Sequence, residues 1–217
     1  MNQKIFRGCV LLVSVSVLSL ASVSAQQTGA RARRGGLDNL SLPSTTARVA
    51  SATTTPGAAA WQTFAPEGTG FSVSLPGAPE EATRAGRESG QLARQFRSYR
   101  LAAGNLKFEV SRTGQLPEEL FLQQGATDKF FEGASQGITM ALARTNSQIK
   151  FKLASEEAIS LDGYEGREYA FEADGHYSVA RIFLIDRAVF ALSIIGPRSE
   201  LTPETVRRFL DSFSLTQ

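Results

Sequence analysis

Two apolar runs near the C-terminal end constrain the fold more than any other feature of the sequence. Residues 179–185 and 189–195 are apolar at almost every position, interrupted mainly by Arg181 and Ser193. A strand with one face in water alternates apolar and polar side chains, whereas a strand that is apolar on both faces lies between two layers. The sequence therefore predicts a central pair of strands in a sheet that is covered on both faces.

Shorter segments alternate apolar and polar residues and predict strands with one buried face. They are residues 61–64, 71–75, 96–101, 106–110, 149–153 and 169–173. Within 106–110, Glu109 falls on the outward face, and within 149–153, Leu153 falls on the inward face. The pairs Asp162-Gly163 and Asp174-Gly175 are typical of tight hairpins, because glycine accepts positive φ without steric cost. We expect a charged loop over residues 80–90.

A long helix is predicted to begin at Pro117, a residue suited to the first helical turn. A stripe for packing on the sheet recurs every three or four residues: Leu122, Ala126, Phe130, Ala134, Ile138 and Ala141. Gly125, Gly133 and Gly137 weaken this helix. The sequence leaves open whether they split the helix or allow it to approach a strand closely.

The last helix has the clearest pattern in the sequence. Thr202 is suited to the N-cap and Pro203 to the first helical position, and Leu201 can pack onto Val206. The apolar residues follow the spacing of one helix face: Val206, Phe209, Leu210 and Phe213. Arg207, Arg208 and Asp211 are expected to face water.

The first 25 residues have the three parts of a secretory signal peptide. Lys4 and Arg7 precede an apolar stretch over residues 10–23, and small side chains then predict cleavage between Ala25 and Gln26. A retained membrane anchor is the alternative, but it needs about 20 strongly apolar residues, whereas four serines interrupt this stretch and Ser24 follows it. Because the only cysteine, Cys9, lies in this segment, the mature chain would contain no disulfide.

Residues 26–60 are rich in Ser, Thr, Ala and Gly and contain almost no large apolar side chain. Such a segment cannot bury enough apolar surface to offset its ordering entropy, so we expect a disordered linker. The linker is basic, whereas acidic residues are in excess from Trp61 onward. Residues 61–217 therefore read as a single, mildly acidic domain, and this charge argues against nucleic-acid binding.

The domain resembles the Mog1/PsbP-like superfamily. The resemblance lies in these segments: Trp61 with Phe64, residues 70–76, Gly163, residues 166–169, residues 180–184 and residues 209–213. It is closest to uncharacterised exported bacterial proteins of that fold. The resemblance implies an α+β fold, a mainly antiparallel β-sheet sandwiched between helices. It also implies a non-catalytic role, because PsbP-like members are extrinsic accessory subunits and Mog1 binds a small GTPase.

No catalytic, cofactor or metal site emerges from the residues. His176, the only histidine, has Asp174 nearby, but a metal site needs three or four ligands. A serine triad would need the same histidine beside a serine and an aspartate. Four carboxylates are candidates for acid–base chemistry: Glu156, Glu157, Glu165 and Glu168. Neighbours in a strand point to opposite faces, and Glu168 is expected to pair with a basic residue of an adjacent strand.

The densest basic stretch of the domain contains Arg94, Arg97 and Arg100, and these are the candidate partner-binding residues. Glutamates interleave with them, so a solvated face is the alternative interpretation. The favoured function is an exported, non-enzymatic binding or accessory module of the cell envelope. It would be secreted or periplasmic, able to act as a monomer, and would bind an envelope or extracellular protein without a cofactor. The alternatives are an extracytoplasmic hydrolase-like enzyme and adhesion to anionic surfaces through the basic linker.

Overall fold

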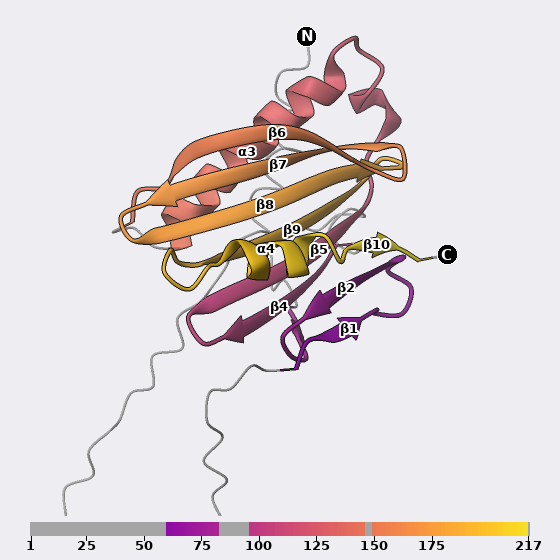
Figure 1. Ribbon diagram of the computed structural model, residues 1–217. Helices are drawn as coiled ribbons and strands as arrows, with labels where there is room; N and C mark the ends of the chain where they lie inside the picture. Colours follow the sequence, from indigo (N-terminus) through magenta and orange to yellow (C-terminus); the bar gives the residue numbers. More distant parts are fainter. Residues whose placement is uncertain (1–59, 83–95, 146–148, 217) are drawn as a thin grey trace, which may run out of the picture.

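The computed structural model describes residues 60–82, 96–145 and 149–216 (Figure 1). The expected signal peptide, its cleavage site at Ala25 and Gln26, the linker up to residue 59 and Arg94 lie outside these residues. The elements in chain order are β1 (Gln62–Phe64), β2 (Phe71–Leu75), β3 (Glu80–Glu81), β4 (Arg97–Ala103), β5 (Leu106–Gln115), the 3-10 helix η1 (Glu118–Leu120), α3 (Ala126–Thr145), β6 (Lys152–Leu161), β7 (Tyr164–Ala173), β8 (His176–Ile185), β9 (Ala188–Pro197), α4 (Pro203–Leu210) and β10 (Ser214–Leu215).

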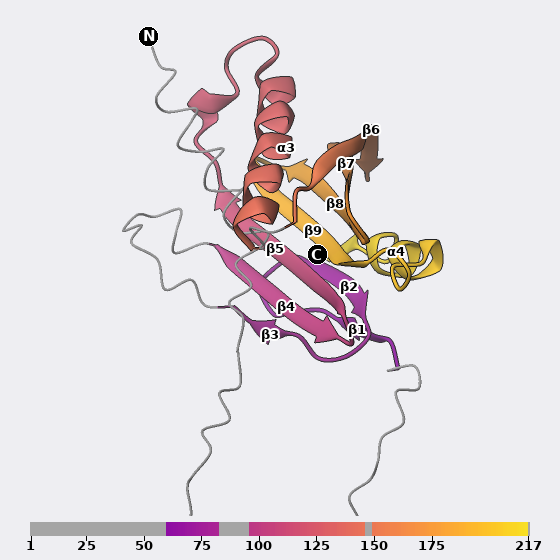
Figure 2. The same cartoon turned by 90° about the vertical axis from the view of Figure 1, so that its left-hand side faces the viewer.

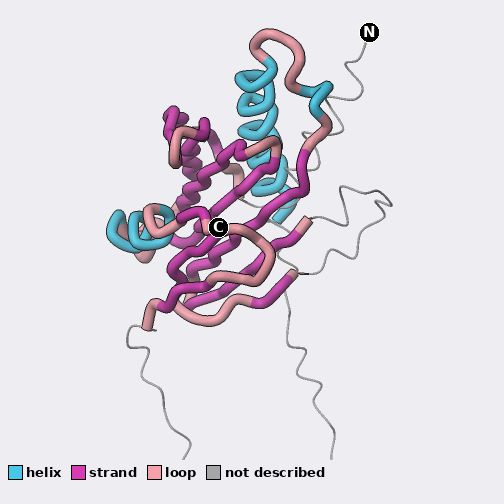
Figure 3. Tube along the Cα trace, turned by 90° about the vertical axis from the view of Figure 1, so that its right-hand side faces the viewer, coloured by secondary structure: helices cyan, strands magenta, loops and turns pink. Residues whose placement is uncertain are grey.

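An antiparallel sheet of seven strands, in the order β3-β4-β5-β9-β8-β7-β6, forms the centre of the molecule. α3 covers one face, while α4 and the β1–β2 hairpin cover the other (Figure 2). The tube in Figure 3 likewise has the two helices on opposite sides of the strands. The fold is thus an α+β sandwich with a mainly antiparallel sheet, as the sequence predicts.

The two apolar runs form β8 and β9, and β9 is the middle strand. Their side chains divide between two cores. Ile182 lies in the core under α3, whereas Leu192 and Ile194 lie in the core on the α4 side, and all three are fully buried. The prediction that these strands are covered on both faces is therefore confirmed.

The long helix was predicted to begin at Pro117, but α3 begins at Ala126. Gly125 has a φ of +72°, a conformation that glycine adopts readily, and α3 begins directly after it. The predicted stripe is buried from Ala126 to Ala141. Leu122 was wrongly assigned to that stripe: it precedes the helix, and its side chain is 71% exposed.

Three further expectations need correction. Glu80–Glu81 is a short strand paired with Arg100 and Tyr99 of β4, so the charged loop does not begin at residue 80. Leu153 is 44% exposed instead of inward, because β6 is an edge strand with an irregular register between Leu153 and Ser155. Glu109 is buried instead of outward.

The last helix confirms the predicted pattern. The Thr202 side chain accepts a hydrogen bond from the Thr205 backbone N–H at the N-cap, and Phe209 and Leu210 are buried. β10 comes shortly after α4 in the chain and pairs with β2. This pairing completes a small sheet in the order β1-β2-β10. None of the helices in the described part of the chain is both long and apolar enough to cross a lipid bilayer.

Candidate functional site

An open groove of about 480 Å³ lies where the small sheet meets the β3–β4 edge of the large sheet. Three separate segments line it: the end of β1 with the β1–β2 connection, the β2–β3 connection with β3, and the start of β4. Its lining residues are Phe64, Pro66, Glu67, Pro79, Glu81, Arg97 and Tyr99. The groove thus combines apolar rings with charges of both signs.

Tyr99 gives the groove a rigid aromatic side, because only 5% of the residue is exposed. Its ring packs edge-on against Phe64, with centroids 4.9 Å apart, and against Phe71 at 6.3 Å. Phe71 is itself fully buried in the core. The aromatic surface offered to a ligand is therefore fixed by the packing of the domain.

Arg97 and Glu81 provide charge at this groove. Their side chains form an ion pair with 3.6 Å between the guanidinium nitrogen and the carboxylate oxygen, and each is about half exposed, at 53% and 54%. Tyr99, and then Glu81, raise the pKa of the Arg97 guanidinium above its ordinary value, so it remains charged. The groove therefore contains a permanent cation whose carboxylate partner is accessible to solvent.

The three arginines expected to bind a partner do not lie on one face. Arg97 lines the groove, but Arg100 is three residues further along β4 and points to the other face of the sheet. There Arg100 pairs with Glu109 at 3.2 Å, and the Ser98 hydroxyl donates a 2.7 Å hydrogen bond to the same carboxylate. Burial raises the pKa of Glu109, and Arg100 and Ser98 oppose that effect. Arg94 lies outside the described residues.

His176 belongs to the β7–β8 hairpin. Its Nδ1 lies 3.1 Å from the backbone carbonyl oxygen of Asp174, so the histidine contacts the turn through the backbone and not through the Asp174 carboxylate. The described residues contain no group of three or more His, Cys, Asp or Glu side chains placed to hold a metal ion.

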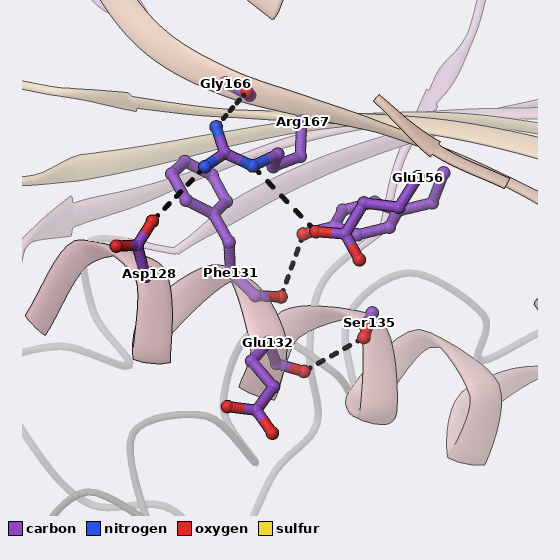
Figure 4. Close-up of polar contacts among 8 residues, drawn as sticks. Asp128, Phe131, Glu132, Ser135, Glu156, Gly166 and Arg167 are labelled. Atoms are coloured by element: carbon purple, nitrogen blue, oxygen red, sulfur yellow. Dashed lines mark hydrogen bonds and ion pairs between the residues drawn. The ribbon is translucent and has the colours of Figure 1, made fainter. Parts of the chain in front are cut away.

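Glu156 belongs to a polar cluster between α3, β6 and β7 (Figure 4). The Arg167 guanidinium lies 3.9 Å from Glu156, 3.3 Å from Asp128 and 4.8 Å above the Phe131 ring. The Tyr169 hydroxyl donates a hydrogen bond to the Phe131 carbonyl in the same cluster. Burial, and then Glu156, raise the pKa of Tyr169, so this phenol stays protonated. The cluster attaches α3 to the sheet.

Glu157 and Glu168 lie on the α4 side of the sheet, whereas Glu165 shares the other face of β7 with Arg167 and Tyr169. Glu157 is opposite Glu168 in the β6–β7 register, and Glu156 is opposite Tyr169, so the two neighbours point to opposite faces as expected. Glu168 accepts a 2.6 Å hydrogen bond from Arg181 of the adjacent strand. The predicted pairing of Glu168 with a basic residue is confirmed. Arg181 also pairs with Asp211 at 2.7 Å, which links the sheet to the end of α4.

Sequence reasoning missed most of the groove. Phe64 and Tyr99 were expected only as strand residues, and Pro66 and Pro79 only as residues that interrupt strands. The available signal was the clustering of proline, glutamate and aromatic residues at the ends of neighbouring strands. That signal does not specify that the three segments converge.

No family model matches the sequence, and no curated protein matches it. Solved structures do match. The solution structure of the cyanobacterial PsbP (CyanoP) from Synechocystis matches with a TM-score of 0.50 and 16% sequence identity, covering 73% of this chain and 94% of that chain. The chain has a PsbP-like fold. The Mog1/PsbP-like resemblance carried by the sequence is thereby confirmed at the level of fold.

Two other solved structures also match this chain. A Pseudomonas aeruginosa protein of unknown function has a TM-score of 0.33 and 15% identity, covering 65% of this chain and 85% of that chain. A Bacteroides thetaiotaomicron protein has a TM-score of 0.34 and 10% identity, covering 71% of this chain and 48% of that chain.

Proposed function

We propose that this chain is an exported, non-catalytic binding module that captures a segment of an envelope or extracellular protein in the groove beside β3. The observation that carries the proposal is the convergence of Phe64, Tyr99 and Arg97 on one open groove. Aromatic residues and arginine dominate the binding energy of protein interfaces. Because the core already holds the Tyr99 ring in place, this ring loses little conformational freedom when a partner binds.

Two further features support this proposal. The PsbP-like fold agrees with an accessory role, by analogy with the extrinsic subunits that share it. Residues 1–25 favour export, because they contain the basic, apolar and small-residue parts of a signal peptide in that order. Together they favour a module that meets its partner outside the cytoplasm.

Site-specific photocrosslinking in the producing cells tests the proposal. A photoreactive phenylalanine analogue replaces Glu67, which lines the groove. We expect adducts of discrete mass after irradiation, and we expect Arg97→Glu to abolish them, because it removes the cation of the groove.

Arg198→Glu is the matched control. Arg198 pairs with Glu172 at 3.6 Å, the distance that also separates Arg97 from Glu81, and its side chain is 66% exposed. This control should leave the adducts intact. Absence of adducts from position 67, or equal loss of adducts in both arginine variants, would contradict a binding role for the groove.

A further inference from the structure

Arg97 lies directly opposite Arg112 in the β4–β5 register. Directly opposite residues of an antiparallel pair place their side chains on the same face, and like charges there destabilise the pair. Tyr99 is two residues from Arg97, so this face is the one that carries the groove. The fold therefore places two arginines directly opposite each other on the face that carries the groove, although packing alone does not favour that arrangement.

The contacts of Arg112 do not neutralise its charge. Its Nη1 donates a 3.2 Å hydrogen bond to the carbonyl of Gly68, and its guanidinium carbon lies 5.4 Å from the centre of the Phe190 ring. Its buried Nε has no hydrogen-bond partner in the described part of the chain. Gly68 directly follows Glu67, which lines the groove, so the charge of Arg112 lies close to the groove.

Glu81 holds Arg97 weakly. The separation of 3.6 Å is longer than a charge-assisted hydrogen bond, and both side chains are about half exposed. Exposed ion pairs of this kind contribute little stability, because water screens them and both side chains lose freedom. A carboxylate from another molecule can therefore replace Glu81 without disturbing the fold.

We propose that the groove recognises a segment of its protein partner that carries one acidic residue between apolar residues. In this complex one carboxylate side chain pairs with Arg97 in place of Glu81, and Arg112 adds the second positive charge. The planar guanidinium fork matches a carboxylate better than a single ammonium does. Phe64, Pro66 and Pro79 offer apolar contacts to the flanking residues. Since Glu67 also lines the groove, a single acidic residue between apolar residues fits the charge balance better than an acidic run.

This inference rests on the proposed binding role of the groove, but purified protein tests it separately. Nuclear magnetic resonance can follow the arginine Nε–Hε signals of the full chain during titration with acetyl-Leu-Glu-Leu-amide. We expect a saturable shift of the Arg97 signal. The affinity for the Gln and Lys analogues of the peptide should be lower by a factor of about ten or more, because they lack the carboxylate.

Substitutions that change the charge of the groove should change the affinity for the Glu peptide in opposite directions. Glu81→Gln removes the competing carboxylate and should tighten binding of the Glu peptide several-fold, whereas Arg112→Gln should weaken it. Glu172→Gln is the matched control, since Glu172 is the carboxylate of the equivalent 3.6 Å pair with Arg198. It should leave the affinity unchanged.

Three results would overturn the inference. They are equal binding of the Glu and Gln peptides, tighter binding of the Lys peptide, and no gain in affinity for Glu81→Gln relative to Glu172→Gln. If crosslinked adducts still form from position 67 in that case, the groove binds a partner by other chemistry. The recognition of a carboxylate then fails while the proposed function stands.

Discussion

The Tyr169 hydroxyl donates a 2.8 Å hydrogen bond to the backbone carbonyl of Phe131, and this bond ties the middle of β7 to α3. Tyr169 is fully buried, so its hydroxyl has no access to bulk water. The bond therefore fixes the position of α3 on the sheet, in addition to the apolar contacts between the helix and the strands.

Tyr169→Phe should lower the free energy of unfolding by about 1–2 kcal/mol, because a buried carbonyl loses its side-chain donor. Urea denaturation of the full chain measures this change. Tyr177→Phe is the control on the neighbouring strand and should change stability by less than about 0.5 kcal/mol, since Tyr177 is only partly buried. Equal effects of the two substitutions would mean that the Tyr169 bond adds no stability.

α4 should be essential to the fold through Phe209. This ring is fully buried and packs edge-on against Phe108 with centroids 5.2 Å apart. Phe209→Ala should destabilise the protein by about 3–5 kcal/mol through the cavity it leaves. Arg208 is on the exposed face, but its guanidinium lies 4.9 Å from the centre of the Trp61 ring. Arg208→Ala should therefore cost about 0.5–1 kcal/mol, as expected for an exposed cation–π contact. Thermal unfolding of both variants measures the difference.

The spacing of apolar residues predicted those elements whose buried faces pack only against other apolar side chains. β8 and β9 lie between two apolar layers and α4 lies on one, so the spacing of apolar residues was sufficient for both. Glu109 lies on the face opposite Phe108 and Val110, as alternation predicts, but it is buried and not exposed. Alternation indicates which side chains share a face but not whether a second layer covers that face. The burial of Glu109 depends on residues distant in sequence.

The groove could not be predicted for a related reason. Its charged pair joins β3 to β4, and its apolar residues come from β1, from the two connections that follow β1 and β2, and from β4, so no local window contains the site. Gly166 is a similar case. A side chain there would place its Cβ 2.9 Å from the Ile182 carbonyl oxygen, and this close approach of two strands is visible only in three dimensions.

The buried Glu109 carboxyl should make stability depend on pH. Because burial raises the pKa of Glu109 in the folded state, the folded protein binds this proton more tightly than the unfolded chain does. The resulting stabilisation is complete below the pKa of the unfolded state and is lost as pH rises through the higher, folded pKa. The wild-type stability minus that of Glu109→Gln should therefore fall over the range above the ordinary glutamate pKa of about 4.3. A difference that rises over this range would mean that Arg100 outweighs burial.

The edge strand β6 should resist self-association through its charges. Glu157 is exposed in a strand at the end of the sheet, and charged residues at such edges oppose pairing with another chain. Glu157→Val should increase the concentration-dependent association measured by light scattering. Glu165→Val is the control, because Glu165 is exposed but lies in β7, which has neighbours on both sides. The same association in both variants would attribute the effect to surface hydrophobicity alone.

The β8–β9 turn should gain stability from glycine. Asp186 and Arg187 both have positive φ, at 48° and 65°, which is unfavourable for residues with a Cβ atom. Arg187 pairs with Glu118 at a distance of 3.7 Å, and half-exposed pairs of this kind contribute little. Arg187→Gly should therefore raise the free energy of unfolding by about 0.5–1 kcal/mol through relief of that strain. The reverse change at Gly175, whose φ is 70°, provides the control: Gly175→Ala should be destabilising by a similar amount. If Arg187→Gly destabilises the protein in urea denaturation, the contacts of the arginine side chain outweigh the strain of its backbone.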